Sequence, residues 1–251
     1  MKVCCVIPFY NHGEAIGQVI ASLRSFALPC FIVDDGSDAA AKIKLLRAIA
    51  TERDVELLTR ATNGGKGEAV IMGCEAAFAA GFTHALQIDA DGQHRAGDVP
   101  VLLAAARAQP DAVISGQAIY DASVPHSRQY GRYITHVWVW INTLSLSIKD
   151  SMCGLRVYPL AAACKVWRRA RIGRRMDFDV EIIVRLAWAG VDIVNVPTQV
   201  TYPVDGVSHF RMLRDNVLIS CMHARLFCGM LVRLPLLLAR RVARIASKVA
   251  A

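Results

Sequence analysis

Short apolar runs, each followed by polar residues, recur through the first third of the chain. The clearest are residues 4–9, 30–33 and 83–88, which hold few polar side chains and show no strict alternation. Such runs are typical of parallel strands that are buried on both faces of a sheet. Residues 15–23, between the first two runs, repeat apolar side chains at helical spacing. The pattern therefore predicts an α/β fold in which strands alternate with helices, with helices on both faces of the sheet.

Polar residues gather directly after these predicted strands, at residues 8–14, 34–38 and 89–94. The carboxyl ends of parallel strands lie at one edge of a sheet, and ligands of open α/β sheets bind beyond that edge. We therefore expect the three polar clusters to form one ligand-binding site.

Asp89 and Asp91 are the most informative pair in these clusters. Two carboxylates one residue apart at the end of a buried strand can share a divalent cation, Mg²⁺ or Mn²⁺, which keeps open positions for substrate phosphate oxygens. Gln93 or His94 would support that cation. An EF-hand calcium loop is excluded, because Gln93 and His94 stand where that motif needs Asp or Asn and then Gly. The alternative is a polar turn that only closes the strand.

The remainder of the domain shows less regular alternation. Apolar spacing predicts helices at residues 99–107, 133–147 and 178–188 and strands at residues 112–116 and 192–196. The polar, proline-containing stretch 120–132 is interpreted as a loop, either a mobile flap over the site or an ordinary surface loop. No internal repeat or low-complexity linker divides the chain, and 251 residues suffice for one α/β domain with a sizeable core.

Positive charge is concentrated at the carboxyl-terminal end. The formal net charge is +8, and residues 211–251 hold eight Lys or Arg against one Asp, which accounts for +7 of it. Charges interrupt the apolar stretches of this tail before they reach the roughly 20 residues that a spanning helix needs. We therefore expect two basic amphipathic helices lying in a membrane interface. Anionic headgroups would be met by Arg240, Arg241, Arg244 and Lys248.

Two other interpretations of the tail were weighed. A helix packed on the domain, with its basic face in solvent, stays open as the alternative to membrane attachment. Nucleic acid is excluded as a partner, because the tail is too apolar and too poor in aromatic residues.

The eight cysteines indicate a reducing compartment. They include no C-x-x-C pair and no zinc-finger spacing, and several lie in apolar stretches, so core thiols are expected rather than disulfides or a zinc site. The N-terminal apolar run is too short for a signal peptide and meets Pro8 too early. We therefore expect the protein on the cytoplasmic face of the membrane, attached peripherally or monotopically.

A series of short motifs, in this order and spacing, resembles glycosyltransferase family 2. The motifs are residues 6–11, 33–37, 63–67, 89–94, 150–156, 178–181 and 206–209. The nearest branch is similar to dolichol-phosphate mannose synthases and related lipid glycosyltransferases. The resemblance implies a GT-A fold with a Rossmann-like sheet, a nucleotide-sugar donor, a divalent metal and an inverting mechanism. It also implies a nucleotide-sugar half at residues 1–95, an acceptor half at 96–210 and a membrane-interface tail at 211–251.

The resemblance also implies roles for single residues. Donor contacts would come from Pro8, Tyr10, Glu14, Asp34, Asp35, Lys66 and Asp89, and the metal would be bound by Asp91. The acceptor side would include Asp150, Arg156, Ser208 and His209. Simpler alternatives exist for four of these residues. Glu14 would complement a helix dipole, and Lys66 would be an exposed lysine at a helix start. Asp34 would cap the next turn, and Arg156 would belong to the scaffold. A P-loop is excluded for Lys66, because no Ser or Thr follows it.

Asp179 and Glu181 are the candidate catalytic residues. A hydroxyl acceptor loses a proton as it attacks, so it needs a carboxylate base within hydrogen-bond reach, whereas a phosphate acceptor needs none. Both residues lie on a predicted helix, and which of them would be the base stays open. The alternative for Glu181 is a structural ion pair with Arg156 or Arg185.

Departures from the family pattern bear on the acceptor. Polyprenyl-phosphate mannosyltransferases carry Arg where this chain has Ala118 and Pro203, and Lys where it has His209. Such cations grip a lipid phosphate. Compensating cations are available at Arg128, Arg132 and Arg211.

On these grounds we favour an inverting, metal-dependent transfer of a sugar from a nucleotide-sugar to the hydroxyl of a lipid-like or cell-envelope acceptor. One alternative is a polyprenyl-phosphate glycosyltransferase. Another is a degenerate nucleotide-sugar-binding protein, against which the intact Asp89 and Asp91 argue.

Overall fold

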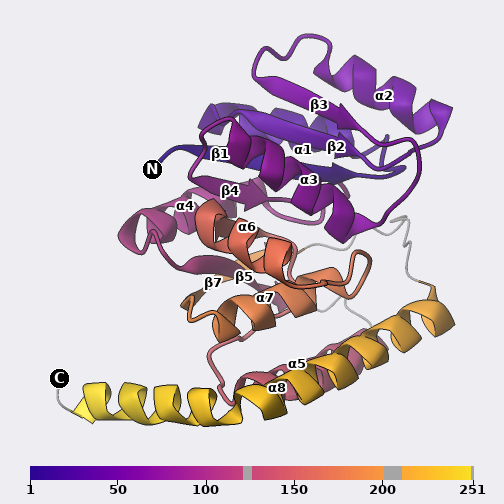
Figure 1. Cartoon of the computed structure of the whole chain (residues 1–251). Helices are drawn as coiled ribbons and strands as arrows, with labels where there is room; N and C mark the ends of the chain where they lie inside the picture. The colour runs from indigo at the N-terminus through magenta and orange to yellow at the C-terminus, as the bar shows by residue number, and fades with distance from the viewer. Residues whose placement is uncertain (121–125, 201–210, 250–251) are drawn as a thin grey trace.

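One mixed sheet organises the protein (Figure 1). The computed structural model describes residues 1–120, 126–200 and 211–249, with side chains for all of them except 120, 126–130 and 244–249. Within these ranges seven strands form the sheet in the order β3-β2-β1-β4-β6-β5-β7. Their bounds are β1 (Val3–Phe9), β2 (Cys30–Asp34), β3 (Val55–Thr59), β4 (His84–Gln87), β5 (Val113–Tyr120), β6 (Arg156–Pro159) and β7 (Ile193–Val200).

The strand directions bring the predicted polar clusters to one edge of the sheet. β1 to β4 are parallel, and β5 is parallel to β7. β6 runs antiparallel to both of its neighbours, β4 and β5, so it starts where they end. The carboxyl ends of β1, β2, β4 and β5 therefore share an edge with the amino end of β6. The prediction of buried parallel strands is confirmed, and β2 and β4 are buried at every position.

Helices cover both faces of the sheet, as the alternating pattern predicts. α1 (Ile16–Leu23), α2 (Ala39–Ile49) and α4 (Val99–Ala108) enclose one apolar core, near the short 3₁₀ helices η1 (Arg24–Phe26) and η2 (Ala96–Asp98). The other core is enclosed by α3 (Lys66–Ala79), α6 (Leu160–Arg169) and α7 (Phe178–Trp188). Each core thus holds a set of strand ends in place at the shared edge.

α5 (His126–Thr143) and α8 (Met212–Val249) form a further layer beside α7 (Figure 1). A third apolar cluster joins the three helices, with Val139 from α5, Val184 from α7 and Leu226 from α8. The C-terminal half of α8 reaches beyond the rest of the molecule in Figure 1. This layer is fixed to α7 by packed apolar side chains.

The expected pair of tail helices is a single helix. α8 is continuous over 38 residues and contains Pro235. A proline inside a helix removes one backbone hydrogen bond and tends to kink the helix, yet α8 continues past Pro235 to Val249. The portion Met212–Ala243 is by length and composition able to cross a membrane, with a mean hydropathy of 1.6 in its most apolar window, of which 22% is buried.

The remaining predicted elements are present with shifted ends. The helix expected at 178–188 is α7 with the same bounds, whereas the helix expected from residue 133 begins at His126. Residues 126–132 were assigned to a loop because they are polar, yet a helix accepts polar residues wherever it does not face the core. The flap interpretation otherwise falls on residues 121–125, outside the described residues.

Candidate active site

The loops after β1 and β2 are held together by side chain–backbone hydrogen bonds. The Asn11 backbone N–H donates to Ser37 Oγ at 3.0 Å, and the Asp38 backbone N–H donates to Asn11 Oδ1 at 2.9 Å. Asn11 has φ of 57°, a left-handed conformation that Asn adopts more readily than most residues. These contacts join two of the three predicted clusters. Pro8 and Tyr10 lie at the junction, at the end of β1.

Asp35 connects β2 to the glycine turn before α3. Its carboxylate accepts the backbone N–H groups of Gly64 at 2.9 Å and Gly65 at 2.7 Å, and Arg60 Nε at 2.9 Å. The neighbouring Asp34 is fully buried, accepts the Ser37 N–H at 3.0 Å, and has Oδ2 without a hydrogen-bond partner among the described residues. Asp35 therefore shapes the turn, and Asp34 Oδ2 faces the Lys42 ammonium at 3.5 Å.

Lys66, the first residue of α3, lies between two carboxylates. Its Nζ is 2.8 Å from Asp89 Oδ2 and 2.7 Å from Asp179 Oδ2. Burial by itself lowers the pKa of Lys66, but the charges of Asp179 and Asp89 outweigh it and raise that pKa well above its usual value. Lys66 is thus a charged bridge between the end of β4 and α7, not an exposed lysine.

Two glycines permit this close arrangement. A Cβ at Gly154 would overlap the Asp89 carboxylate and lie 2.7 Å from Lys66 Nζ. A Cβ at Gly67 would lie 2.6 Å from the Phe178 side chain, where α3 meets α7. Both positions are restricted to glycine by close approach, so the motifs at 63–67 and 150–156 have a packing reason.

Asp89, Asp91 and His94 meet at the end of β4. His94 Nε2 is 3.8 Å from Asp89 Oδ2, and the Gln93 N–H donates to Asp91 Oδ1 at 3.0 Å. Burial and then the negative charge of Asp89 raise the pKa of Asp91. Burial also acts to raise the pKa of Asp89, but Lys66 and His94 hold it well below its usual value. The site therefore combines a firmly ionised carboxylate, Asp89, with one whose pKa is raised because His94 and Lys66 only partly offset burial and the charge of Asp89.

The geometry fits a divalent cation as a partial ligand set. Asp89 Oδ1 and His94 Nδ1 are buried without a hydrogen-bond partner among the described residues. In the same part of the chain, no group of three or more His, Cys, Asp or Glu is placed to hold a metal alone. In enzymes that act on phosphorylated substrates, Mg²⁺ is commonly bound by one or two carboxylates together with substrate phosphates and water. The Asp89 and Asp91 pair matches that pattern.

Asp179 is supported from β4 and β6. Gln87 Nε2 donates to its Oδ1 at 3.3 Å, and Arg156 Nη1 donates to its backbone carbonyl at 2.6 Å. Arg156 is fully buried and its Nη2 also donates to the Ser151 carbonyl at 2.6 Å. Arg156 therefore holds the frame of the site, as the scaffold alternative describes, and its acceptor role stays a prediction.

Glu181 belongs to a different cluster. It is fully buried, and Arg185 donates to its Oε1 through Nε at 2.8 Å and Nη2 at 2.6 Å. Arg225 Nη2 and the Gly173 N–H donate to its Oε2 at 2.6 and 2.8 Å. The alternative of a structural ion pair thus describes Glu181, with Arg185 and Arg225 as the partners.

Asp150 joins α5 to β5 through its carboxylate. Arg132 Nη2 donates to both of its oxygens at 2.9 and 2.8 Å, and the Ala118 N–H donates at 3.2 Å. His136 Nε2, one turn further along α5, is 3.5 Å from Asp150 Oδ1. Arg132 therefore stands beside position 118. The side chain of Arg128 and the residues Ser208 and His209 lie outside the described part of the chain.

Glu14 is not brought into this site. Its side chain is 88% exposed and pairs with Lys44 of α2. Other residues contribute although sequence reasoning did not select them: Arg60 bonds Asp35, and Gln87 bonds Asp179 while accepting the Tyr158 hydroxyl at 3.2 Å. The one sequence feature that indicates such a contribution is Gln87, a polar residue inside an apolar run.

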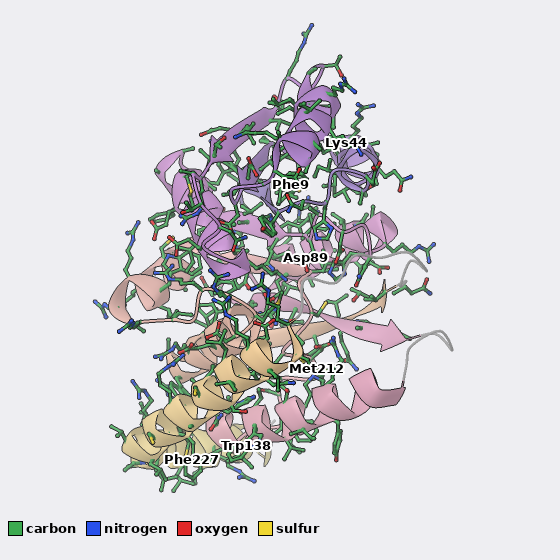
Figure 2. All side chains as sticks on the ribbon, turned by 90° about the vertical axis from the view of Figure 1, so that its right-hand side faces the viewer. Phe9, Lys44, Asp89, Trp138, Met212 and Phe227 are labelled. Carbon is green, nitrogen blue, oxygen red and sulfur yellow. The ribbon has the colours of Figure 1, made fainter. Side chains whose placement is uncertain are left out.

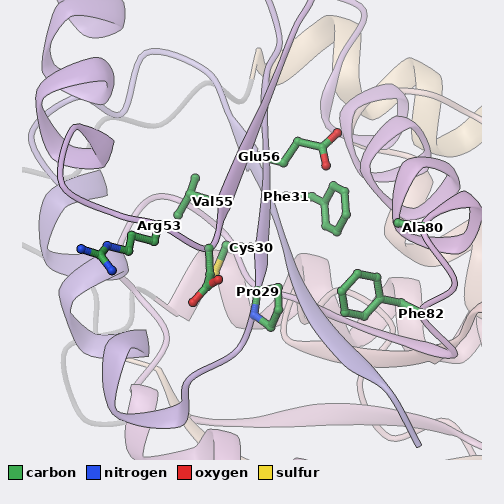
Figure 3. A pocket seen from close by; sticks show the side chains of 9 residues that line it. Pro29, Cys30, Phe31, Arg53, Val55, Glu56, Ala80 and Phe82 are labelled. Carbon is green, nitrogen blue, oxygen red and sulfur yellow. The ribbon is translucent and has the colours of Figure 1, made fainter.

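A shallow cavity of about 250 Å³ lies at the opposite edge of the sheet (Figure 3). Its lining includes Pro29, Phe31 and Val55, at the amino ends of β2 and β3, and Phe82 before β4. None of the site residues selected from the sequence lines it. The carboxyl edge, where Asp89 is seen in Figure 2, remains the candidate site.

Sequence comparisons identify the family. A model of the family described as "Glycosyl transferase family 2" matches residues 4–170. An undecaprenyl-phosphate mannosyltransferase from Micrococcus luteus is 30% identical over 204 residues, which cover 78% of this chain and 82% of that protein. A polyprenol monophosphomannose synthase from Mycolicibacterium smegmatis is 25% identical over 231 residues, which cover 86% and 83%.

Solved structures give the same fold. Glucosyl-3-phosphoglycerate synthase from Mycobacterium tuberculosis, crystallised with Mn²⁺ and UDP-glucose, matches with a TM-score of 0.64 at 14% identity, over 92% of this chain and 78% of that chain. At this identity the likeness establishes a shared GT-A fold.

Proposed function

Because the chain belongs to glycosyl transferase family 2, whose model matches residues 4–170, we propose that it transfers a sugar from a nucleotide-sugar to a polyprenyl phosphate at a membrane surface. The family establishes a glycosyltransferase. The acceptor, the metal and the inversion of configuration are the proposal. The contacts of the two carboxylates on α7 carry the choice of acceptor.

Both candidate bases, Asp179 and Glu181, are already engaged in ion pairs. Glu181 is buried among Arg185, Arg225 and the Gly173 N–H, and Asp179 is paired with Lys66 at 2.7 Å. A hydroxyl acceptor needs a base to take its proton, whereas a phosphate acceptor is already an anion at neutral pH. The arrangement supports the phosphate acceptor over the hydroxyl that the sequence favours. Relatives named for undecaprenyl phosphate and polyprenol support the same choice.

Arg132 can supply the positive charge that is missing because Ala118 stands in place of an arginine. The Ala118 N–H and Arg132 Nη2 both donate to Asp150 Oδ2, at 3.2 and 2.8 Å, so the Arg132 guanidinium lies beside the position where an arginine is missing. His136 lies close by on the same helix. An acceptor phosphate at this place would be held by the positive charge of Arg132.

The metal would be held by Asp91 and Asp89, with Gln93 or His94 beside it. A bound Mg²⁺ or Mn²⁺ would supply positive charge against the negative charge that develops on the departing nucleoside diphosphate. Support comes from the Asp89 oxygen without a hydrogen-bond partner among the described residues and from the raised pKa of Asp91. The Mn²⁺ crystallised with the M. tuberculosis glycosyltransferase is consistent with it.

The chain's own groups then perform one displacement. The Gly64–Gly65 turn, held by Asp35, lets the backbone approach the nucleotide, and Lys66 fixes Asp89 beside the sugar. Arg132 holds the acceptor phosphate, one oxygen of which attacks the anomeric carbon. That carbon–oxygen bond forms while the bond to the leaving diphosphate oxygen breaks on the opposite face. The configuration inverts, and no proton is transferred.

Exposed apolar side chains support membrane attachment. On the α5–α8 layer they include Tyr133, Ile134, Trp138, Ile141, Met212, Leu213, Val217, Leu231 and Val232. Figure 2 shows Trp138 and Phe227 together on this layer, with ring centroids 6.1 Å apart. A surface of this extent is typical of proteins that meet a membrane or a partner. We propose that the α5–α8 layer lies in the membrane interface, where a polyprenyl chain would be at hand.

The orientation of the tail arginines differs from the sequence expectation. Arg240 Nη1 donates to the Trp188 carbonyl at 2.8 Å instead of facing headgroups, whereas Arg241 is exposed. The side chains of Arg244 and Lys248 lie outside the described ones. Membrane attachment through α8 is therefore proposed to depend more on apolar contact than on the number of basic residues.

The test is an acceptor comparison. Purified full-length protein is incubated with undecaprenyl phosphate or undecaprenol in detergent, with GDP-mannose or UDP-glucose and with MgCl₂, MnCl₂ or EDTA. We expect a glycolipid only with the phosphate and only with metal. Product from undecaprenol alone would overturn the acceptor, and binding of a nucleotide-sugar without any transfer would indicate a binding protein instead.

A further inference from the structure

The first turn of α7 lies between two ionic clusters. On one side Asp179 pairs with Lys66 at 2.7 Å, and on the other Glu181 pairs with Arg225 at 2.6 Å. Residues two apart on an α-helix point in directions about 200° apart. A rotation or shift of this turn therefore moves both carboxylates together, and whatever fixes Glu181 also fixes Asp179.

Arg225 is the contribution of α8 to the second cluster. Its Nη2 donates to Glu181 Oε2 at 2.6 Å and its Nε to Oε1 at 3.3 Å. The Glu181 side chain is 0% exposed, whereas the Arg225 side chain is 45% exposed. A buried carboxylate is costly unless it is paired and hydrogen-bonded. Here part of that pairing comes from a surface helix that can be altered without opening the core.

α8 also holds the other end of α7. Arg240 Nη1 donates to the carbonyl of Trp188, the last residue of α7, and the Arg233 guanidinium lies 4.7 Å from the centroid of the Trp188 ring. Positive charge at a helix carboxyl end complements its dipole, as negative charge does at the amino end. Arg225, Arg233 and Arg240 recur at seven or eight residues, which places them on one face of α8. That face turns toward α7 along its length.

We propose that Arg225 is a positioning residue of the transfer reaction, which acts through Glu181 to keep the first turn of α7, and with it the Asp179–Lys66 pair, in the catalytic arrangement. The inference rests on the proposed function, because it concerns the same site. α8 is then part of the catalytic frame as well as of the membrane-facing layer.

The test is Arg225→Gln, which keeps part of the aliphatic stem and a polar end but shortens the side chain and removes its charge. We expect faster hydrogen exchange in a peptide covering residues 174–183 and a kcat lower by about tenfold, with the KM for the nucleotide-sugar nearly unchanged, because misplacing a group acts on the transition state. Transfer is measured with undecaprenyl phosphate and GDP-mannose or UDP-glucose, and Arg225→Lys should restore part of the rate. Sedimentation with anionic vesicles should not change.

The matched control is Arg168→Gln, which breaks an Arg–Glu pair between α6 and α3. We expect wild-type exchange at 174–183 and wild-type kcat. Unchanged exchange and kcat in Arg225→Gln would overturn the inference, as would a kcat that falls only in proportion to the folded fraction. A wild-type protein that transfers nothing, while Arg225→Gln still loosens α7, would overturn the proposed function and leave the coupling of α8 to α7 standing.

A double-mutant cycle gives a second test of whether Arg225 acts through Glu181. If Arg225 acts through Glu181, adding Glu181→Gln to Arg225→Gln should lower kcat by much less than the product of the two single effects. Fully multiplicative effects would show that the two residues act independently and would refute the inference.

Discussion

The carboxyl edge of the sheet and the α5–α8 layer differ in the kind of group that they expose: the edge gathers carboxylates, and the layer exposes apolar side chains. At the edge, the carboxylates of Asp89 and Asp91 converge with one lysine between Asp89 and Asp179. On the α5–α8 layer, Trp138 and Leu213 are exposed, while Arg225 and Arg240 turn inward to α7. The edge thus has unbalanced charge and the layer has uncovered apolar surface.

This difference indicates two kinds of partner. Unbalanced carboxylates at the end of a buried strand are costly alone and suit a cation with a phosphorylated ligand. Uncovered apolar side chains suit a membrane, while Arg225, Arg233 and Arg240 of the tail contact α7. The enzyme is therefore expected to join a soluble donor to a lipid acceptor across the short distance between these regions.

The largest loss of activity is expected at the carboxyl edge, when the carboxylate proposed to bind the metal is removed. Asp91→Ala is expected to lower turnover by at least about 1,000-fold and to abolish the metal dependence of donor binding, because a bound cation supplies several kcal/mol of charge stabilisation. Transfer rates and calorimetric titration of the nucleotide-sugar with and without MnCl₂ measure this. The exposed Asp111→Ala is the control. Undiminished activity in Asp91→Ala would remove the metal assignment.

A smaller effect is expected from crowding the same site. In Gly154→Ala the added Cβ would overlap the Asp89 carboxylate and force Asp89 and Lys66 apart. A displacement near 1 Å costs on the order of 100-fold in rate. Gly17→Ala, where nothing lies within 4 Å of the new Cβ, should keep full activity. Equal rates in the two variants would show that Asp89 does not need its present position.

Much of the edge is predictable from the sequence because its residues act locally. A strand end fixes the place of Asp89, and the glycine turn places Lys66 at the start of α3. The partners of these residues are not predictable in the same way. Asp179 reaches Lys66 only because Gly67 lets α3 approach Phe178 closely, a contact between residues far apart in the chain.

The α5–α8 layer is less predictable for the same reason. Pro235 and the scattered arginines indicated two helices, yet packing against α5 and α7 supports one. Whether Glu181 is a base or an ion-pair partner depends on Arg225, which follows it by 44 residues. Composition located the basic, apolar tail, and only the structure shows which arginines face the protein.

The membrane role of the layer can be sharpened without removing α8, whose Met222, Leu226 and Met230 are buried in the third core. Replacing the exposed Leu213, Val217 and Val232 by Ser should weaken vesicle binding by about tenfold or more, since each apolar contact contributes up to about 1.5 kcal/mol. Sedimentation with anionic vesicles at low and high salt measures it.

Serine at Ile43, Leu46 and Val101, which are exposed on α2 and α4, is the matched control and should leave binding unchanged. Equal loss in both triple variants would mean that apolar exposure acts nonspecifically. Release by salt alone would show that headgroup charge dominates over apolar contact.

The smallest expected effect concerns Asp150, which ties the two regions together through Arg132 and His136 of α5. Burial acts to raise the pKa of Asp150, but His136, Arg132 and the Met152 N–H outweigh it and hold that pKa well below its usual value of about 3.9. A lowered folded-state pKa means that the carboxylate stabilises the fold above about pH 4 and that this contribution is lost as the pH falls further.

At pH 6, Asp150→Asn should therefore lower the free energy of unfolding by about 1 to 3 kcal/mol, the range for hydrogen bonds to a charged group. Urea unfolding from pH 6 to pH 2 should show this gap closing toward the acid end, whereas Asp111→Asn, at an exposed position, should show a small and constant gap. A gap for Asp150→Asn that does not change with pH would mean that its charge does not hold α5 to the sheet.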